Sequence, residues 1–386
     1  MRDQAKLRSE LRPHGVVSAA CRPCFLLEAC GGIQPERSLL NCFDLNCCGQ
    51  GGKCGRICPY NPDFMRRLEE VGGLRFDDLR PVVQRRAELP RYVPVIDHRL
   101  RRHDVLHYPA VALNTYRVLR VKGNKYRTLS ESPEHIRAAF GIAKDTQIIL
   151  RGTARDPFLE RYWQYGERDD AAGQLAALGV TLTIAPNFSH VLNVPRTEHL
   201  YNRKRQLHCI EEMVEAGLNV APYLSAVVPG DWDFWREYVG DNGTISYVAK
   251  EFQTGDRSPT QGRKSIDALA SLQNSLGRKL HPLIIGGAQF VEYVAARFEA
   301  FTLIDSAPFV KTNRRRRFAI SPGKHPWRES WTLIGQGLDQ ILDDNVSRYA
   351  SWIEQRISFE RSRIANSREG GLSSSSRAGL TTARAL

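Results

Sequence analysis

Residues 283–305 begin with Leu283-Ile284-Ile285-Gly286-Gly287 and end with Phe301-Thr302-Leu303-Ile304-Asp305, with a helix-prone segment, Phe290–Phe298, between them. The two apolar runs are rich in β-branched and aromatic residues, a composition typical of buried strands. A strand, a helix and a second strand in this order predict a βα unit whose strands are parallel. The stretch therefore favours an α/β protein over an all-α or all-β one.

Similar apolar runs recur along most of the chain. Besides those two (Leu283–Ile285 and Phe301–Ile304), they are Pro109–Leu119, Gln147–Leu150, Val180–Ile184, Leu218–Leu224 and Ile245–Val248, and Tyr92–Ile96 supplies an eighth. Eight strands separated by helical patterns predict a closed (β/α)8 TIM-like barrel. An open doubly wound parallel sheet is the alternative. No Gly-x-Gly-x-x-Gly follows an early strand, so the usual dinucleotide-binding signature is missing.

Helix signals separate these runs. The clearest helix is Thr197–Ala216, which starts at a capping threonine and stops at Gly217. A second, Arg263–Leu276, stops at Gly277 in the same way. A long helix-prone stretch, Trp327–Ile364, is expected to pack outside the barrel.

The composition divides the chain into five parts. Residues 1–20 form a polar leader, 21–79 a cysteine-rich metal-binding module and 80–107 a basic connector. The barrel domain is expected over 108–366. The Ser/Arg/Gly-rich end, 367–386, is expected to be disordered because it has little apolar material to bury.

Eight of the nine cysteines are concentrated in the module. They are Cys21, Cys24, Cys30, Cys42, Cys47, Cys48, Cys54 and Cys58, and only Cys209 lies elsewhere. We find no export signal and no apolar stretch approaching the roughly 18 residues of a membrane span, so a cytoplasmic protein with reduced thiols is expected. Clustered cysteines in that compartment usually bind metal, which predicts that these eight are metal ligands.

The cysteine spacing leaves the metal open. Structural zinc prefers paired cysteines with short spacers, and only Cys21 and Cys24 form a clean Cys-x2-Cys. Cys58-Pro59 resembles the Cys-Pro that closes many ferredoxin motifs, and an iron–sulfur cluster tolerates mixed spacers better. An iron–sulfur cluster and zinc therefore remain the two alternatives, followed by no metal at all.

The chain carries a formal net charge of +13 and an isoelectric point near 9.4. An excess of cations of this size favours an anionic partner, and nucleic acid, DNA or RNA, is the first candidate. A generally arginine-rich composition is the alternative explanation.

Polar residues follow most of the predicted strands. In a closed barrel, the active site is built from the carboxyl ends of the strands and the loops after them. We therefore take the residues at these ends as site candidates. The candidate catalytic residues are Asp305, His190, Lys250 and Glu251, and the candidate substrate-binding residues are Arg151, Asn187, Ser225, Gln253, Gly286, Gly287 and Ser306. Ser189 is a further polar residue after a predicted strand. Each also has a structural alternative. Asn187 and Ser189 can cap a loop, and neighbours such as Lys250 and Glu251 point in opposite directions on a strand.

Asp305 is the leading catalytic candidate because it ends an apolar run, where a carboxylate can be partly desolvated and act as nucleophile or general base. Six residues later comes a basic stretch with four consecutive arginines, Arg314, Arg315, Arg316 and Arg317. This run is a candidate phosphate-binding patch. Its alternative is a solvated basic loop.

The segment from His281-Pro-Leu-Ile-Ile-Gly-Gly-Ala-Gln-Phe through Phe301-Thr-Leu-Ile-Asp-Ser-Ala-Pro-Phe to the basic stretch resembles the late part of tRNA-guanine transglycosylases and of the related DNA 7-deazaguanine enzymes. The resemblance covers residues 281–317. It implies that Asp305 attacks the ribose C1′ and that Gly286 and Gly287 admit the base. The chain departs from the family in lacking the early Asp-Ser-Gly-Gly-Phe motif and the late zinc motif, since no cysteine follows Cys209.

Three functional hypotheses follow from these features. The first is a nucleic-acid-directed, base-exchanging glycosyltransferase in which Asp305 is the nucleophile. The second is an iron–sulfur redox or radical enzyme that uses the cysteine-rich module. The third is a non-catalytic nucleic-acid-binding protein.

Overall fold

The computed structural model describes residues 66–375, with gaps at 68, 75, 77–78, 99–101, 123–124, 191–195 and 320–329. The eight clustered cysteines, Cys21 to Cys58, and the last residues, 376–386, lie outside this part of the chain. The metal site therefore stays a prediction.

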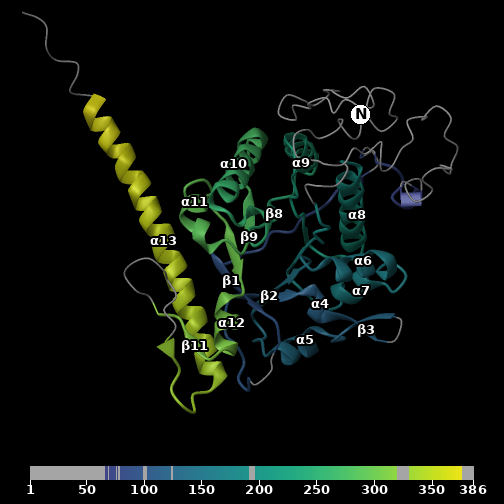
Figure 1. The fold of residues 1–386 in the computed structure, drawn as a ribbon, viewed down its shortest axis with the longest axis horizontal. Helices are drawn as coiled ribbons and strands as arrows, with labels where there is room; N and C mark the ends of the chain where they lie inside the picture. The colour runs from purple at the N-terminus through teal and green to yellow at the C-terminus, as the bar shows by residue number, and fades with distance from the viewer. Residues whose placement is uncertain are drawn as a thin grey trace, which may run out of the picture.

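Eight parallel strands form the centre of the molecule (Figure 1). They are β1 (Tyr92–Ile96), β2 (Ala110–Asn114), β5 (Gln147–Arg151), β6 (Leu182–Ile184), β7 (Val220–Ala221), β8 (Tyr247–Glu251), β9 (His281–Ile285) and β10 (Thr302–Asp305). Apart from β7 and β8, each strand pairs with the next one along the chain in this list, and β10 pairs with β1. A parallel bridge between Tyr223 and Ala249 joins β7 to β8 and closes the ring. The predicted barrel is confirmed, and the open-sheet alternative is wrong.

Helices connect the strands and cover the barrel (Figure 1). They are α4 (Thr115–Val118), α5 (Pro133–Phe140), α6 (Asp156–Tyr165), α7 (Ala171–Ala176), α8 (Arg196–Glu215), α9 (Pro229–Asp241), α10 (Pro259–Leu276), α11 (Val291–Ala295), α12 (Ala307–Asn313) and α13 (Leu338–Ser375). Short 3-10 turns, η3 (Gly255–Arg257) and η4 (Ala288–Phe290), precede α10 and α11. Helix α10 ends at Leu276 as predicted, where Gly277, with φ +62°, stops it. It begins at Pro259 and not at the predicted Arg263, because Ser258 caps it.

Two segments differ from the sequence-based expectation. The apolar run Pro109–Leu119 is a strand only to Asn114; it then turns into α4 and a two-stranded ribbon of β3 (Leu119–Lys122) and β4 (Lys125–Thr128). The helix expected over Trp327–Ile364 begins at Leu338 and continues to Ser375. A short pair, β11 (Arg316–Arg317) with β12 (Ser330–Trp331), precedes it.

The barrel interior is filled by alternate residues of the strands. The interior cluster consists of Val93, Val95, Ala110, Ala112, Ile149, Leu182, Ile184, Ala221, Tyr247, Ala249, Leu283, Ile285 and Ile304. The remaining strand residues, such as Leu113, Leu150 and Leu303, belong to a larger cluster that packs between the strands and the helices. Because successive strand side chains point to opposite faces, this division shows which strand-end residues face inward.

The segment before β1 closes the amino-terminal end of the barrel. The Gln84 Nε2 donates hydrogen bonds to the carbonyl oxygens of Val220 (2.9 Å) and Tyr247 (2.8 Å). Ala87 and Leu89 pack against the interior cluster. We therefore expect a functional site in this barrel at the carboxyl-terminal end of the strands, as in other barrels of this type.

None of the helices in the described part of the chain is long and apolar enough to cross a membrane.

Candidate functional site

A layer of polar residues lies immediately above the apolar interior, at the carboxyl ends of the strands. Counting two residues on from Val95, Ala112, Ile149, Ala221, Ala249 and Ile304 leads to Asp97, Asn114, Arg151, Tyr223, Glu251 and Ser306. The pleat directs Asn114, Arg151 and Glu251, the last residues of their strands, toward the barrel axis. Asp97, Tyr223 and Ser306 lie within two residues after a strand end. We call these six residues the mouth layer.

On one side of the mouth layer, Asp97 is held by two neighbours. Arg117, in α4, donates from Nε to Asp97 Oδ1 (2.9 Å) and from Nη2 to Oδ2 (2.7 Å). Asn114 Nδ2 also donates to Asp97 Oδ1 (3.1 Å). This two-pronged contact fixes the carboxylate and places one arginine at the rim.

Arg151 lies next to Asn114, because the two residues are register partners on β2 and β5. The Arg151 Nε and the Asn114 Oδ1 are buried, and neither has a hydrogen-bond partner among the described residues. Burial also lowers the pKa of Arg151, an effect that the carboxylate of Glu251 partly opposes. An unpaired buried donor and acceptor side by side are the groups expected to bind a ligand or water.

Glu251 provides the carboxylate of the mouth layer that interacts with Arg151. Burial raises the pKa of Glu251, while the positive charges of Arg151 and Lys250 lower it. Tyr223 lies near it, and burial together with the charges of Glu251 and Asp256 raises the pKa of the Tyr223 hydroxyl. The mouth layer thus combines a guanidinium with a free Nε and a carboxyl group whose proton is held more tightly than usual.

Asp305 lies on the other side of the barrel wall. It follows Ile304, which is interior, and so has the same orientation as Leu303, which packs against the helices. Its Oδ1 accepts a hydrogen bond from the Ala307 N–H at the start of α12 (2.8 Å), and its Oδ2 accepts one from the Tyr349 hydroxyl of α13 (2.9 Å). Burial raises the pKa of Asp305, and these two bonds and the charge of Arg151 oppose the change. The carboxylate therefore joins β10 to two helices.

Lys250 is also directed outward, being the neighbour of inward-facing Glu251. Its Nζ lies 3.0 Å from Asp256 Oδ2 and donates to the Leu224 carbonyl oxygen at 3.3 Å. It also lies 5.6 Å from the ring centre of Trp232. These contacts occupy the ammonium group and tie the loops after β7 and β8 together.

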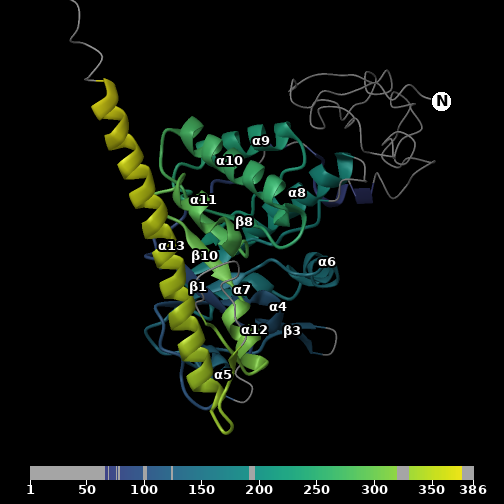
Figure 2. The same ribbon diagram turned by 60° about the vertical axis from the view of Figure 1, so that its left-hand side comes forward.

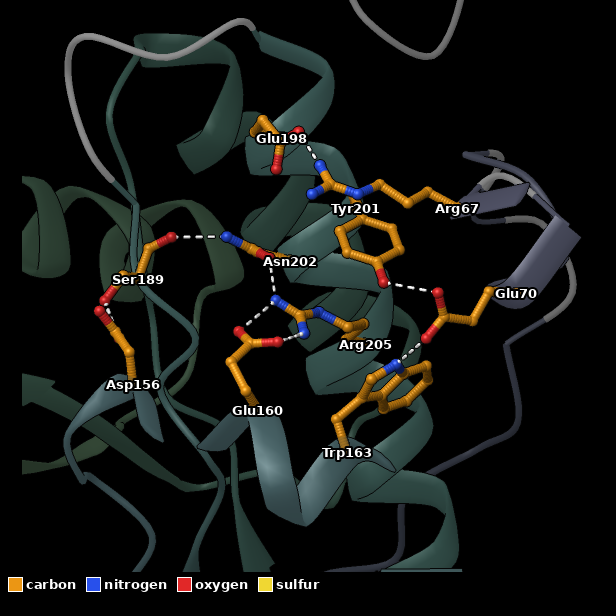
Figure 3. A network of polar contacts seen from close by, with 10 residues as sticks. All are labelled: Arg67, Glu70, Asp156, Glu160, Trp163, Ser189, Glu198, Tyr201, Asn202 and Arg205. Atoms are coloured by element: carbon orange, nitrogen blue, oxygen red, sulfur yellow. Dashed lines mark hydrogen bonds and ion pairs between the residues drawn. The ribbon is translucent and has the colours of Figure 1, made fainter. Parts of the chain in front are cut away.

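The loop after β6 is held by a network of polar contacts (Figure 3). Ser189 donates to Asp156, and Asn202 of α8 donates to the Ser189 carbonyl oxygen (2.6 Å). Figure 3 shows Arg205 of α8 bonded to Asn202 and, separately, the Tyr201 hydroxyl donating to Glu70, which precedes the barrel. The Arg205 guanidinium lies 4.6 Å from the centre of the Tyr201 ring. Asn187 Oδ1 accepts a hydrogen bond from the Ala154 N–H (2.9 Å), so this residue fixes a loop as well.

His190 and Ser225 form a second contact at the rim, between β6 and β7. The Ser225 Oγ lies 3.3 Å from His190 Nε2, and His190 Nδ1 lies 2.8 Å from the Phe188 carbonyl oxygen, to which it can donate. Burial and the charge of Arg203 lower the pKa of His190 to about 3. The imidazole is therefore uncharged near neutral pH and is engaged on both nitrogens.

Gly286 and Gly287 have a conformational role. Both have positive φ angles, +67° and +72°. A Cβ on Gly286 would lie 2.5 Å from the Gln253 Cγ, and one on Gly287 would lie 2.7 Å from the Phe252 Cβ. The glycines thus let the end of β9 turn closely past the loop after β8, and exposed Gln253 covers the turn.

The arginine run lies at the far end of α12, whose seven residues carry the chain roughly 10 Å from Asp305. Arg315 donates two hydrogen bonds to the Gln336 carbonyl oxygen (2.9 Å each), and Arg317 lies 3.6 Å from Asp344. Figure 1 places β11 beside the start of α13. The structure thus groups Arg314, Arg315, Arg316 and Arg317 with α13 and not with Arg151 and Glu251.

Three members of the mouth layer were missed by the sequence analysis. Asp97, Asn114 and Tyr223 lie two residues beyond apolar interior positions, and counting in twos along each strand is the signal that identifies them. Asn114 was not identified as a strand end because the apolar run Pro109–Leu119 continues past it.

No group of three or more His, Cys, Asp or Glu side chains with metal-binding geometry occurs within the described ranges. Cys209, in α8, is buried and has no disulfide partner there.

Comparison with known proteins adds little to this geometry. No protein-family model and no curated protein sequence matches the chain. Among solved structures, one from Anabaena variabilis, named for a proposed sugar phosphate isomerase or epimerase activity, has 13% identity and a TM-score of 0.33. The match covers 64% of this chain and 88% of that one. A similarity this low supports no argument about function.

Proposed function

We propose that this chain is an enzyme that binds a small oxyanion-bearing substrate in the barrel mouth. Arg151 would bind the carboxylate or phosphate group, and Glu251 would transfer a proton to or from the substrate. The observation that carries the proposal is the buried, unpaired Arg151 Nε in the same inward layer as Glu251.

Arg151 suits an oxyanion for two reasons. A guanidinium presents its donors in a planar fork that matches a carboxylate or phosphate, and charge-assisted bonds of this kind are the strong ones. A buried donor without a partner is costly to the folded state. An incoming oxyanion would remove that cost, and the adjacent unpaired Asn114 Oδ1 could accept a hydrogen bond from a substrate hydroxyl.

Glu251 suits proton transfer because burial raises its pKa. A general acid or base works best when its pKa lies near the operating pH, and perturbed carboxyl groups in clefts are typical of catalytic sites. Glu251 and Arg151 both follow interior residues, Ala249 and Ile149, by two positions, so a substrate held by the guanidinium in the barrel mouth would lie near the carboxyl group.

The transglycosylase-type reaction and its nucleic-acid substrate remain predictions. They require Asp305 as nucleophile, whereas its two carboxylate oxygens accept hydrogen bonds from Ala307 and Tyr349. We therefore assign the chemistry to Glu251.

The proposal can be tested by ligand-induced stabilisation. Thermal unfolding would be followed with inorganic phosphate, glycerol phosphate, hexose phosphates and small hydroxy acids. A ligand present at 100 times its Kd stabilises the folded state by about 2.7 kcal/mol. We expect at least one of these anions to raise the Tm of the wild type and to have no effect on Arg151→Gln.

The matched control is Arg86→Gln, an exposed arginine in the segment before β1, which should respond like the wild type. Failure of every anion to raise the wild-type Tm, or an equal response of Arg151→Gln, would contradict the proposal.

A further inference from the structure

The ribbon formed by β3 and β4 has one face made only of cations. The two strands are antiparallel, with Arg120 opposite Arg127 and Lys122 opposite Lys125. Because these four residues alternate with Leu119, Val121, Tyr126 and Thr128, all four side chains lie on the same face. Each of the four is exposed.

The opposite face anchors the ribbon to the barrel domain. Leu119 and Tyr126 are buried. The Tyr126 N–H donates to Asp169 Oδ2 (2.8 Å), and the Thr128 N–H donates to Gln174 Oε1 of α7 (3.1 Å). The cationic face is therefore held outward, and Figures 1 and 2 show β3 at the edge of the molecule, beyond α4.

The arrangement is unfavourable for the isolated chain. Like charges directly opposite one another destabilise a pair of strands. None of the four cations forms an ion pair with a carboxylate in the described part of the chain; Lys125 comes nearest, acting on Asp169 through its charge alone. An anionic partner would turn this repulsion into attraction.

We propose that the cationic face of the β3–β4 ribbon binds the phosphate backbone of duplex DNA. A two-stranded ribbon fits into the major groove of B-DNA, which is about 12 Å wide, whereas the major groove of A-form RNA is too deep and narrow to admit side chains. The net charge of +13 adds a general attraction between the molecule and a polyanion. This inference does not rest on the proposed function of the mouth layer.

The ribbon lies near the carboxyl-terminal end of the barrel strands. It belongs to the connection after β2, whose first residues form α4 and include Arg117, bound to Asp97 in the mouth layer. DNA on the ribbon would therefore lie beside the rim of the barrel and not at its amino-terminal end.

The test compares two variants with equal charge change. The first combines Arg120→Gln, Lys122→Gln, Lys125→Gln and Arg127→Gln. The control combines Arg257→Gln, Arg263→Gln, Lys264→Gln and Lys279→Gln, four exposed cations from α10 and its flanking loops. Binding of the full chain to a 20-base-pair DNA duplex, about two helical turns, would be measured at several salt concentrations. The slope of log K against log salt is negative, and each lost phosphate contact makes it less steep by about 0.9.

We expect the ribbon variant to lose about three to four units of this slope and the control to keep its slope close to the wild-type value. The ribbon variant should also have a Tm at least as high as the wild type, because the repulsion is removed, so that lost binding cannot be attributed to unfolding. Equal losses in the two variants would overturn the proposal and leave only general charge attraction. Tighter binding to an RNA duplex of the same length, or to phosphatidylserine vesicles than to DNA, would also overturn it.

Discussion

Strands β8 and β10 both end in a carboxylate, yet Glu251 and Asp305 lie on opposite sides of the barrel wall. Glu251 has the same orientation as Ala249, inside the barrel, and faces Arg151. Asp305 has the same orientation as Leu303, outside it, and binds the start of α12 and Tyr349. Burial raises the pKa of both groups, so burial alone does not distinguish a catalytic carboxyl group from a structural one.

The difference shows that one position along a strand decides whether a side chain faces the barrel interior or the surrounding helices. In a strand, a shift by one position exchanges the two faces. Lys250 and Glu251 are neighbours, and one binds Asp256 and the Leu224 carbonyl outside the barrel while the other faces its axis. We therefore expect the two carboxylates to respond oppositely to substitution: Glu251 through chemistry and Asp305 through stability.

The largest expected effect is on proton transfer. Glu251→Gln keeps the shape of the side chain but removes the titrating group, and should slow exchange of a substrate proton by about 10²- to 10⁴-fold. The measurement is incorporation of deuterium from D2O into the anion that stabilises the wild type, followed by NMR. Asp305→Asn should change this rate less than about tenfold, because proton transfer by Glu251 remains. If Asp305→Asn is as slow as Glu251→Gln, Asp305 takes part in the reaction, as the sequence analysis predicted.

The second effect is on the free energy of unfolding. Asp305→Ala removes the acceptor for the Ala307 N–H and the Tyr349 hydroxyl, and should cost about 2 kcal/mol. Glu251→Ala removes no hydrogen bond made by its carboxylate to a described residue, and should cost less than Asp305→Ala. Urea unfolding at neutral pH measures both. Equal losses in the two variants would mean that Glu251 is also a structural group.

The strands could be located from the sequence, but the face toward which their last side chains point could not be predicted. The strand Tyr92–Ile96 was predicted with the bounds that it has, and the closed barrel followed from the number of runs. Parallel strands in a barrel are buried on both faces, so apolar residues such as Leu303 and Ile304 are adjacent and hydropathy does not show which one is interior. For this reason Glu251 and Arg151 were grouped with Lys250 and Asp305.

Other features depend on tertiary contacts that no local pattern contains. The contact between Arg117 and Asp97 joins α4 to the end of β1, and its geometry follows from the turn after Asn114. The cationic face of the ribbon depends on the register between β3 and β4. Neither could be derived from a segment that was interpreted as one apolar run ending at Leu119.

A smaller effect distinguishes the two tyrosines near these carboxylates. Tyr349→Phe should cost about 1 kcal/mol, because its hydroxyl donates to Asp305 Oδ2 in a buried environment. Tyr223→Phe should cost less, because its hydroxyl has a hydrogen bond with the Glu251 backbone and none with a carboxylate among the described residues. Urea midpoints of the two variants give the comparison. If Tyr223→Phe lost more unfolding free energy than Tyr349→Phe, the Tyr223 hydroxyl in the barrel mouth would contribute more to stability than the Tyr349 hydroxyl.

The smallest expected effect is a pH dependence carried by Glu251. Burial raises its pKa above the ordinary value of 4.5, so the folded protein holds this proton more tightly than the unfolded chain does. The stability that the group contributes is therefore fully present below about pH 4.5 and is lost as the pH rises through the folded-state pKa. The glutamine of Glu251→Gln does not titrate, so only the wild type loses this stability as the pH rises. The free energy of unfolding of Glu251→Gln should therefore increase relative to that of the wild type between pH 4 and 7. Urea unfolding at intervals of one pH unit would measure the difference, which should become constant once Glu251 is ionised in the folded protein. A difference that stays flat over the whole range would show that the carboxyl group titrates normally, and would remove the raised pKa as an argument for Glu251 as the proton-transferring group.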